Sequence, residues 1–240
     1  MERSSLRYAH LVQELGLNAV HREIIALVGP AQRVLDVGCS TGYLGQALQT
    51  EASRQVDGIE LDPAAAQIAQ RHYHRVFVGS VEDVAFVQSI AETYDAIILA
   101  DVLEHLARPE CVLAALAPLL KPGGYLLISV PNIAFYDIRR RLFFRGEWRY
   151  TDTGILDHTH LRFYTYHTIR DLVAAAGWWV VEQRVGVAWI PFERRLGRSF
   201  IGKRVVASPA YARFRRRLIG RYPNLFGHHS VLKVVPANDG

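Results

Sequence analysis

The segment RVLDVGCSTGYLG, residues 33–45, reads as a strand, a tight turn and the start of a helix. Its apolar first part contains the acidic residue Asp36, and Gly38 and Gly42 follow before a helical pattern begins. Glycine allows a tight turn and the close approach of a ligand, and the first N–H groups of a helix are free to bind one. The segment therefore predicts a loop that holds a nucleotide-type cofactor.

The position of Asp36 indicates which cofactor. It lies two residues before Gly38, where the pyrophosphate of a dinucleotide would otherwise lie, and two like charges there would repel. A positively charged amino-acid tail would be attracted instead, which favours S-adenosylmethionine over NAD. The dinucleotide pattern G-x-G-x-x-G also fails, because Ser40 and Thr41 follow in the turn.

Strand and helix patterns alternate along most of the chain, which predicts a mostly parallel sheet covered by helices on both faces. A first helix is expected within 4–28, with Asn18 as a cap and Gly29-Pro30 as its end. The expected strands are 33–37, 55–60, 75–78, 94–100, 124–130, 178–187 and 230–235. The expected later helices are 42–50, 63–72, 82–91, 109–119 and 166–176. The last strands are expected to add antiparallel at an edge.

The ends of the next strands carry residues suited to a nucleoside. Glu60 lies 22 residues after Gly38, near the spacing at which an acid accepts hydrogen bonds from ribose hydroxyls. Ser80 and Val81 follow the third strand and are expected to edge the adenine, and Asp101 follows the fourth, near the methionine end. These positions meet at one edge of a parallel sheet, where ligands bind in such folds.

The chain resembles the class I S-adenosylmethionine-dependent methyltransferases, with similarity to the branch of ubiquinone-type, glycan- or natural-product-associated O-methyltransferases. The resemblance covers about residues 30–190 and lies in LDVGCSTG, VDGIELDP, YDAIILADVLEHL, LKPGGYLLISVPN and LDHTHLRFYT. It implies a Rossmann-like sheet of seven strands, mostly parallel with the last strand antiparallel. The charge pattern of this chain adds a helical basic insertion to that fold. The resemblance also implies an enzyme whose cofactor is S-adenosylmethionine and whose product is S-adenosylhomocysteine.

The resemblance assigns the cofactor contacts by position. At the methionine end it places Asp36, Gly38, Cys39 and Gly42, with Ser40 and Tyr43 in the same stretch. Glu60 is assigned to the ribose, and the base is assigned to Leu61, Ser80 and Val81. The methionine carboxylate or sulfonium is assigned to Asp101 and Val102. Relatives often have a third glycine at Ser40 and an acid at Ser80. Cys39 is expected to be a small turn residue, in a position that could lower its pKa.

A hydroxyl acceptor must lose a proton, and histidine is the side chain best suited to take it at neutral pH. The segment LDHTHLRFYT supplies His160 and His158 as candidate catalytic residues, and the resemblance favours His160. Asp157 or another carboxylate is expected to orient the ring; the alternative is that His160 hydrogen-bonds a loop backbone and only shapes the acceptor pocket. No metal is expected, because no third ligand has matching spacing. His105 is expected to line the pocket, and His228 and His229 to face solvent at the start of the last strand.

Positive charge is concentrated near the C-terminus. Residues 190–225 contain ten arginines and lysines and one acid, although the whole chain carries only +5. Two basic stretches interleave arginines with large apolar residues: 133–148 and 211–222, where Tyr211, Phe214, Leu218 and Tyr222 would share one helical face. Three interpretations stay open: a solvated helical cap, a lid that clamps an anionic acceptor, and an anionic membrane surface. No recognised nucleic-acid motif accompanies the charge, which disfavours that partner.

Length and composition fit one methyltransferase domain over 1–240. We divide it into N-terminal helices (1–30), a cofactor-binding core (31–131), an acceptor-side insert or lid (132–165) and a C-terminal sheet part (166–240) with the basic insertion 190–228. Two distant cysteines and the absence of a signal or a spanning apolar run favour a cytoplasmic protein, with peripheral membrane attachment left open.

The leading hypothesis is O-methylation of a small, sugar or lipid-linked acceptor by in-line methyl transfer. Its acceptor rests on analogy, because one fold serves many functions. One alternative is a nucleic-acid or protein methyltransferase that uses the basic segment, which strong salt dependence would reveal. The other is a non-catalytic cofactor-binding scaffold, which the intact set of Asp36, Gly38, Gly42 and Glu60 disfavours.

Overall fold

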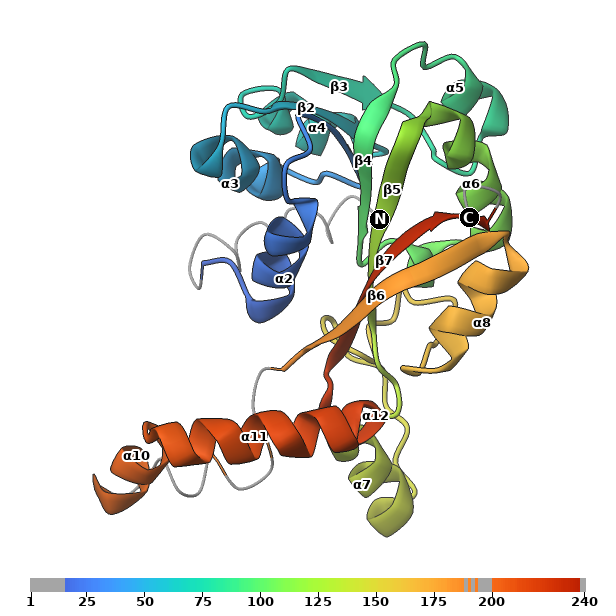
Figure 1. The fold of residues 1–240 in the computed structure, drawn as a ribbon. Coiled ribbons are helices and arrows are strands. Elements are labelled where there is room, and N and C mark those ends of the chain that lie inside the picture. Colours follow the sequence, from blue (N-terminus) through green and yellow to red (C-terminus); the bar gives the residue numbers. More distant parts are fainter. Residues whose placement is uncertain (1–15, 188–189, 191–192, 194–199, 238–240) are drawn as a thin grey trace.

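The computed structural model describes residues 16–187, 190, 193 and 200–237. It contains one seven-stranded sheet in the order β3-β2-β1-β4-β5-β7-β6 (Figure 1). The strands are β1 (Arg33–Val37), β2 (Gln55–Glu60), β3 (Arg75–Val78), β4 (Tyr94–Ala100), β5 (Leu120–Pro131), β6 (Trp178–Gly186) and β7 (His229–Pro236). β1 pairs in parallel with both β2 and β4, so the carboxyl ends of these strands meet at one edge.

The expected mostly parallel sheet, with the last strands added antiparallel at one edge, is confirmed. β7 pairs antiparallel with both β5 and β6, and therefore lies inside the sheet while β6 forms the edge. β7 has buried residues facing both sides, including Val231, Leu232 and Val234, and an interior position covers both of its faces.

Helices cover both faces of the sheet, and each face has its own hydrophobic core. On one face lie α2 (Ala19–Val28), α3 (Tyr43–Glu51) and α4 (Pro63–Ala69), and on the other α5 (Val84–Gln88), the 3₁₀ turn η1 (Leu103–His105), α6 (Pro109–Leu116), η2 (Ala117–Leu119) and α8 (Thr168–Ala175). Asn18 caps α2 by accepting a hydrogen bond from the His21 N–H, as the sequence predicted. The part of the expected first helix before residue 16 lies outside the described residues.

The basic stretch 133–148 and the basic insertion 190–228 contain helices that lie at one end of the molecule, beyond the sheet (Figure 1). They are α7 (Tyr136–Arg145), α10 (Phe200–Val206), α11 (Pro209–Arg221) and α12 (Pro223–Phe226). On α11 the rings of Tyr211 and Phe214 lie 6.1 Å apart, as expected for one helical face, but burial along that face is uneven. Tyr211 and Ile219 are buried with Ile190, whereas Phe214 and Tyr222 are exposed. Arg215 turns inward because its Nε donates to Glu193 at 2.8 Å.

In the described part of the chain, we find no helix that is both long and apolar enough to cross a bilayer.

Two glycines with opposite surroundings test how tightly the core is packed. A Cβ on Gly45 in α3 would lie 2.3 Å from the ring of Tyr73, whereas a Cβ on Gly220 in α11 would meet nothing within 4 Å. We expect Gly45→Ala to lower the free energy of unfolding by about 1–3 kcal/mol through overpacking. The control Gly220→Ala should leave it unchanged or raise it by up to about 1 kcal/mol, because alanine favours the helix. Urea unfolding measures both, and equal stability of the two variants would contradict this packing.

Candidate active site

The glycine turn after β1 is fastened to the end of β2 by backbone hydrogen bonds. The carbonyl of Ile59 accepts from the N–H groups of Gly38 at 2.8 Å and Cys39 at 3.0 Å. The next N–H, that of Ser40, donates to Glu60 Oε2 at 2.7 Å. Three successive donors of the turn thus point at two residues of β2, which fixes the turn where a cofactor would lie.

This turn requires glycine at Gly38 for two reasons. Its φ is +72°, a conformation that other residues rarely adopt, and a Cβ there would lie 2.9 Å from Cγ2 of Val102. Ser40 stands where relatives often have a third glycine, and it adopts φ +49°. The chain therefore accepts some backbone strain at Ser40 to keep the turn, and such strain is concentrated at functional sites.

Glu60 is placed to accept further hydrogen bonds. The residue is 6% exposed, and each of its oxygens accepts one backbone N–H, from Ser40 and, at 2.9 Å, from Asp62. Each carboxylate oxygen has a second lone pair, so a diol can still be bound. The two backbone donors hold the carboxylate rigid, and this geometry fits the ribose of the expected cofactor.

Asp36 is the most deeply buried acid of the glycine turn. It is 2% exposed, and its Oδ2 accepts a hydrogen bond from the Tyr73 hydroxyl at 2.6 Å. Burial, with the charge of the nearby Glu60, raises the pKa of Asp36 to about 7 despite the lowering effect of the Tyr73 hydrogen bond. A cationic ligand group next to Asp36 would favour the ionised form, which agrees with the sequence argument for a positively charged cofactor tail.

Cys39 does not have the lowered pKa that its position suggested. The residue is buried, and its sulfur packs against Gly58, where a Cβ would lie 2.7 Å from it. Burial raises the pKa of the thiol far above its usual value, and the charges of Asp36 and Glu60 raise it further. Cys39 is therefore an unreactive packing residue of the turn, as the simpler expectation held.

Asp101, directly after β4, is held in a strained and charged setting. Its φ is +54°, its Oδ1 accepts from the Ser129 hydroxyl at 2.6 Å, and its Oδ2 lies 3.5 Å from His229 Nε2. Burial would raise the pKa of Asp101, but His229 and the Ser129 hydrogen bond outweigh it and hold that pKa below its usual value. Asp101 thus carries a negative charge at the strand edge.

The expectation that His228 and His229 face solvent is wrong. His229 is 9% exposed, and its Nδ1 lies 2.7 Å from Nδ1 of His228. Burial, with the neighbouring His229, lowers the pKa of His228 to about 3. Sequence reasoning missed the contacts of His229 and Ser129 with Asp101. These residues come from β7 and β5, and only the order of the strands in the sheet brings them to Asp101.

The residues assigned to the adenine lie at the ends of β2 and β3. Leu61 is 47% exposed, a large apolar side chain free to cover a flat base, and Val81 is largely buried beneath the same edge. The Ser80 hydroxyl accepts from the Glu82 N–H at 3.2 Å and so shapes the turn after β3. Tyr43, at the start of α3, packs its ring 5.1 Å from that of His21.

His160 lies beside η1, the turn that follows the β4 edge. Its ring packs edge-on against His105 at 4.8 Å, and its Nδ1 donates to the Ile155 carbonyl at 3.1 Å. Burial and the charge of His105 lower the pKa of His160, so the ring is neutral at pH 7. The bond to Ile155 leaves the lone pair on Nε2, as a proton acceptor requires.

Asp157 does not orient the His160 ring as expected. Its Oδ1 accepts from the Thr159 N–H at 2.9 Å and hydroxyl at 2.7 Å, and the Ile155 carbonyl orients the ring instead. His158 is exposed, with Nδ1 3.7 Å from Asp157. The structure therefore distinguishes the two candidate histidines: His160 is half-buried and fixed, and His158 faces solvent.

A parallel sheet with a glycine turn after β1 and an acid at the end of β2 is the fold of class I S-adenosylmethionine-dependent methyltransferases. The chain belongs to the methyltransferase-domain family, whose model matches residues 3–183. The expected class of protein and its cofactor, S-adenosylmethionine, are thereby confirmed.

Similar proteins agree with this family. Ubiquinone biosynthesis O-methyltransferases of Xanthomonas campestris and Vibrio cholerae are 37% identical over 124 residues and 32% identical over 131 residues. These matches cover 48% and 51% of this chain, and the chain spans about half the length of these curated relatives.

Solved structures show the same fold at lower identity. A SAM-dependent methyltransferase from Archaeoglobus fulgidus matches with a TM-score of 0.59 and 16% identity, over 95% of this chain and 99% of that one. Magnesium protoporphyrin IX methyltransferase of Synechocystis, solved with bound S-adenosylhomocysteine, matches with a TM-score of 0.55 and 15% identity, over 90% and 81%.

Replacing Glu60 tests the ribose contact. We expect Glu60→Ala to weaken binding of S-adenosylhomocysteine by roughly 30-fold or more, since hydrogen bonds to a charged acceptor contribute on the order of 2 kcal/mol. Calorimetric titration measures the affinity, and thermal denaturation checks that the variant folds. The control Glu51→Ala, on the exposed end of α3, should bind as the parent does. Unchanged affinity in Glu60→Ala would remove Glu60 from the site.

The buried Asp36 predicts a pH-dependent stability. Its pKa is 3.8 in the unfolded chain and about 7 in the folded one, so its stabilising contribution is complete below pH 3.8 and is lost as the pH rises through 7. Asp36→Asn imitates the protonated form and should lack this loss, which is at most on the order of 4 kcal/mol.

The measurement is the free energy of unfolding at several pH values, compared between parent and variant. The difference between the two should change between pH 4 and 7 and stay constant above. Asp171→Asn, on exposed α8, is the control and should follow the parent. Parallel curves for Asp36→Asn and the parent would show that Asp36 titrates normally.

Proposed function

We propose that the protein transfers the methyl group of S-adenosylmethionine to a hydroxyl oxygen of a small, sugar or lipid-linked acceptor. The observation that carries this proposal is His160, a neutral imidazole whose ring is fixed by the Ile155 carbonyl and whose Nε2 remains basic. The relatives named ubiquinone biosynthesis O-methyltransferases support oxygen as the acceptor atom.

In this proposal the cofactor residues are those assigned from sequence, with Asp36 and the turn at the methionine end and Glu60 on the ribose. When bound, the cofactor supplies an electrophilic methyl group on a sulfonium. His160 Nε2 accepts the proton of the acceptor hydroxyl, whose oxygen forms the new bond to carbon as the bond to sulfur breaks. The electron pair stays on sulfur, and the product is S-adenosylhomocysteine. His158 is the second candidate for the base.

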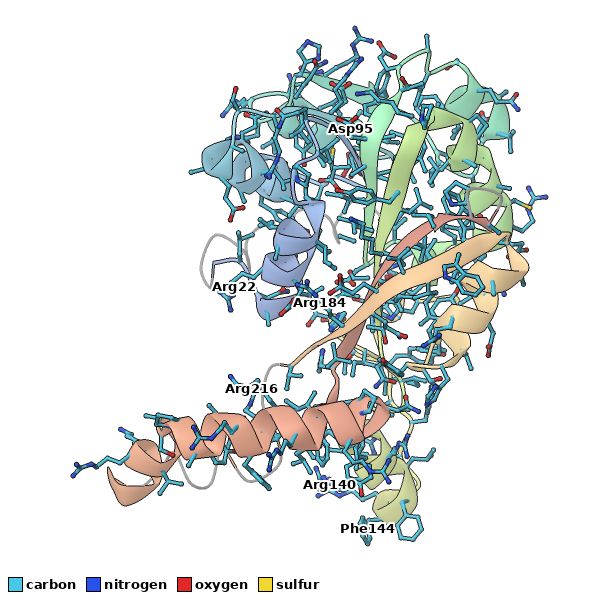
Figure 2. All side chains as sticks on the ribbon, in the orientation of Figure 1. Arg22, Asp95, Arg140, Phe144, Arg184 and Arg216 are labelled. Atoms are coloured by element: carbon cyan, nitrogen blue, oxygen red, sulfur yellow. The ribbon has the colours of Figure 1, made fainter. Side chains whose placement is uncertain are left out.

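We also propose an anionic membrane surface as the place where the acceptor is met. Phe143 and Phe144 on α7 are 82% and 76% exposed, an unusual exposure for phenylalanine. Exposed arginines accompany them on the same helix, and Figure 2 shows Arg140 and Phe144 together at the end of the molecule far from Asp95. Apolar side chains among arginines fit a lipid surface with negative head groups.

Replacing the two histidines tests the chemistry. We expect His160→Ala to lower kcat by roughly 100-fold or more, the contribution typical of a general base, with cofactor affinity within twofold of the parent. His158→Ala should have a much smaller effect, and His167→Ala, at the exposed start of α8, serves as the control. The measurement is transfer of an isotopically labelled methyl group, and equal turnover of His160→Ala and the parent would discard the base.

The same labelling, with separate soluble and membrane fractions of a cell extract, identifies the acceptor. A labelled lipid-soluble or sugar product identified by mass spectrometry would support the proposal. Label in nucleic acid or protein would support the alternative in which the basic helices bind a macromolecule. No labelled product, together with no binding of S-adenosylhomocysteine, would contradict the methyltransferase function.

A further inference from the structure

Tyr73 fills a slot that three glycines leave open beside the glycine turn. The residue lies in the loop between α4 and β3 and is 6% exposed. A Cβ on Gly42 would lie 3.0 Å from its ring, one on Gly45 2.3 Å and one on Gly58 3.3 Å. These glycines belong to the turn, to α3 and to β2. The ring therefore fits only because three neighbouring segments have no side chain at this point.

The hydroxyl of Tyr73 joins two parts of the site. It donates a hydrogen bond to Asp36 Oδ2 at 2.6 Å and accepts one from the Gly45 N–H at 3.0 Å. The Gly45 N–H is one of the first N–H groups of α3, which have no acceptor within the helix. Gly42, the residue before α3, has no side chain to cap them. Tyr73 supplies this acceptor and so fastens Asp36 to the start of α3.

The direction of these two bonds is fixed by their chemistry. A backbone N–H can only donate, so the hydroxyl accepts from Gly45 and its single hydrogen is left for Asp36. The glycine slot holds the ring, so this donor cannot turn away from the carboxylate. Asp36 is therefore oriented by a fixed donor, as Glu60 is by its two backbone N–H groups.

We propose that Tyr73 is a positioning residue for the cofactor, which holds the ionised Asp36 where the positively charged tail of the cofactor binds. This inference rests on the proposed function, in which Asp36 lies at the methionine end. Tyr73 acts through Asp36 and not on the reacting atoms. No sequence signal pointed to Tyr73, because it lies 37 positions after Asp36 and outside the glycine pattern.

The same hydrogen bond acts on the charge of Asp36. Burial, with the charge of Glu60, raises the pKa of Asp36 to about 7, and the Tyr73 hydrogen bond opposes this rise. Cys39, the titratable residue of the turn next to Asp36, stays a neutral thiol because burial raises its own pKa. Loss of the Tyr73 hydroxyl should therefore raise the pKa of Asp36 further and leave less of it ionised at neutral pH.

The test separates the tail of the cofactor from its nucleoside. S-adenosylhomocysteine carries the amino-acid tail, whereas methylthioadenosine has the same nucleoside and sulfur without it. At neutral pH we expect Tyr73→Phe to weaken binding of S-adenosylhomocysteine by roughly tenfold, as for a lost hydrogen bond to a charged group, and that of methylthioadenosine by less than about twofold. Calorimetric titration measures both affinities. Phenylalanine keeps the ring in its slot, so the fold should persist, as methylthioadenosine binding and circular dichroism check.

Tyr94→Phe is the matched control. The Tyr94 hydroxyl also donates to a buried aspartate, Asp57, whose Oδ2 lies 3.0 Å away. Tyr94 is the first residue of β4, whereas the site lies where the strands end. This variant loses the same kind of hydrogen bond and should bind both ligands as the parent does.

A double variant tests whether Tyr73 acts through Asp36. Asp36→Asn removes the charge and should remove the preference for the ligand that carries the tail. Tyr73→Phe, added to Asp36→Asn, should then cause no further loss of this preference, whereas independent effects would add.

The pH profile is a second readout that a packing role would not move. The preference of the parent for the ligand with the tail should rise between about pH 6 and pH 8 as Asp36 ionises. In Tyr73→Phe the same rise should occur at higher pH.

Any of three results would overturn the proposal. These are unchanged binding of S-adenosylhomocysteine by Tyr73→Phe, equal weakening of both ligands, which would make Tyr73 a packing residue only, and additive losses in the double variant. The titrations contain no acceptor, so they do not depend on methyl transfer. A protein in which Tyr73 controls binding of the tail but which methylates nothing would refute the proposed function alone. Methyl transfer by a protein whose Tyr73→Phe variant binds as the parent does would refute only the role of Tyr73.

Discussion

The hydrogen bonds between the glycine turn and the end of β2 are the constraint on which the site depends. The Ile59 carbonyl and the Glu60 carboxylate together accept three successive N–H groups, from Gly38, Cys39 and Ser40. These bonds fix the turn and orient Glu60 at the same time. The glycine turn and the carboxylate of Glu60 are therefore parts of one rigid unit.

Three buried carboxyl groups near this edge have different pKa values because their hydrogen-bonding and charged partners differ. Asp36 accepts a hydrogen bond from the Tyr73 hydroxyl, but this bond does not offset the effect of burial, so the pKa of Asp36 is raised to about 7. Asp101 has His229 and Ser129, and its pKa is lowered. Glu104 has no side-chain partner in the described structure, and burial, with the charge of Asp101, raises its pKa well above the usual value. The charge of this edge is thus determined by Tyr73, by Ser129 of β5 and by His229 of β7.

The insert after β5 connects the chemistry to the outer surface. Phe135 and Ile138 at the start of α7 pack with Ile155 and Leu156, which precede the histidine loop. The same short core therefore supports the Ile155 carbonyl that orients His160 and the helix that carries the exposed Phe143 and Phe144. This packing gives a physical connection between the exposed end of α7 and His160.

The sequence by itself determined the local elements and the cofactor edge. Apolar runs, the two glycines and the acids Asp36 and Glu60 act over short distances, so strands, the turn and the class of cofactor could be predicted. Only the tertiary structure decided that β7 inserts between β5 and β6, that His229 is buried against Asp101, and that Cys39 is buried. It also decided that Glu104 and His105 meet His160. The reason is that strand order, burial and long-range contacts depend on which surfaces pack together, and spacing along one chain does not specify that.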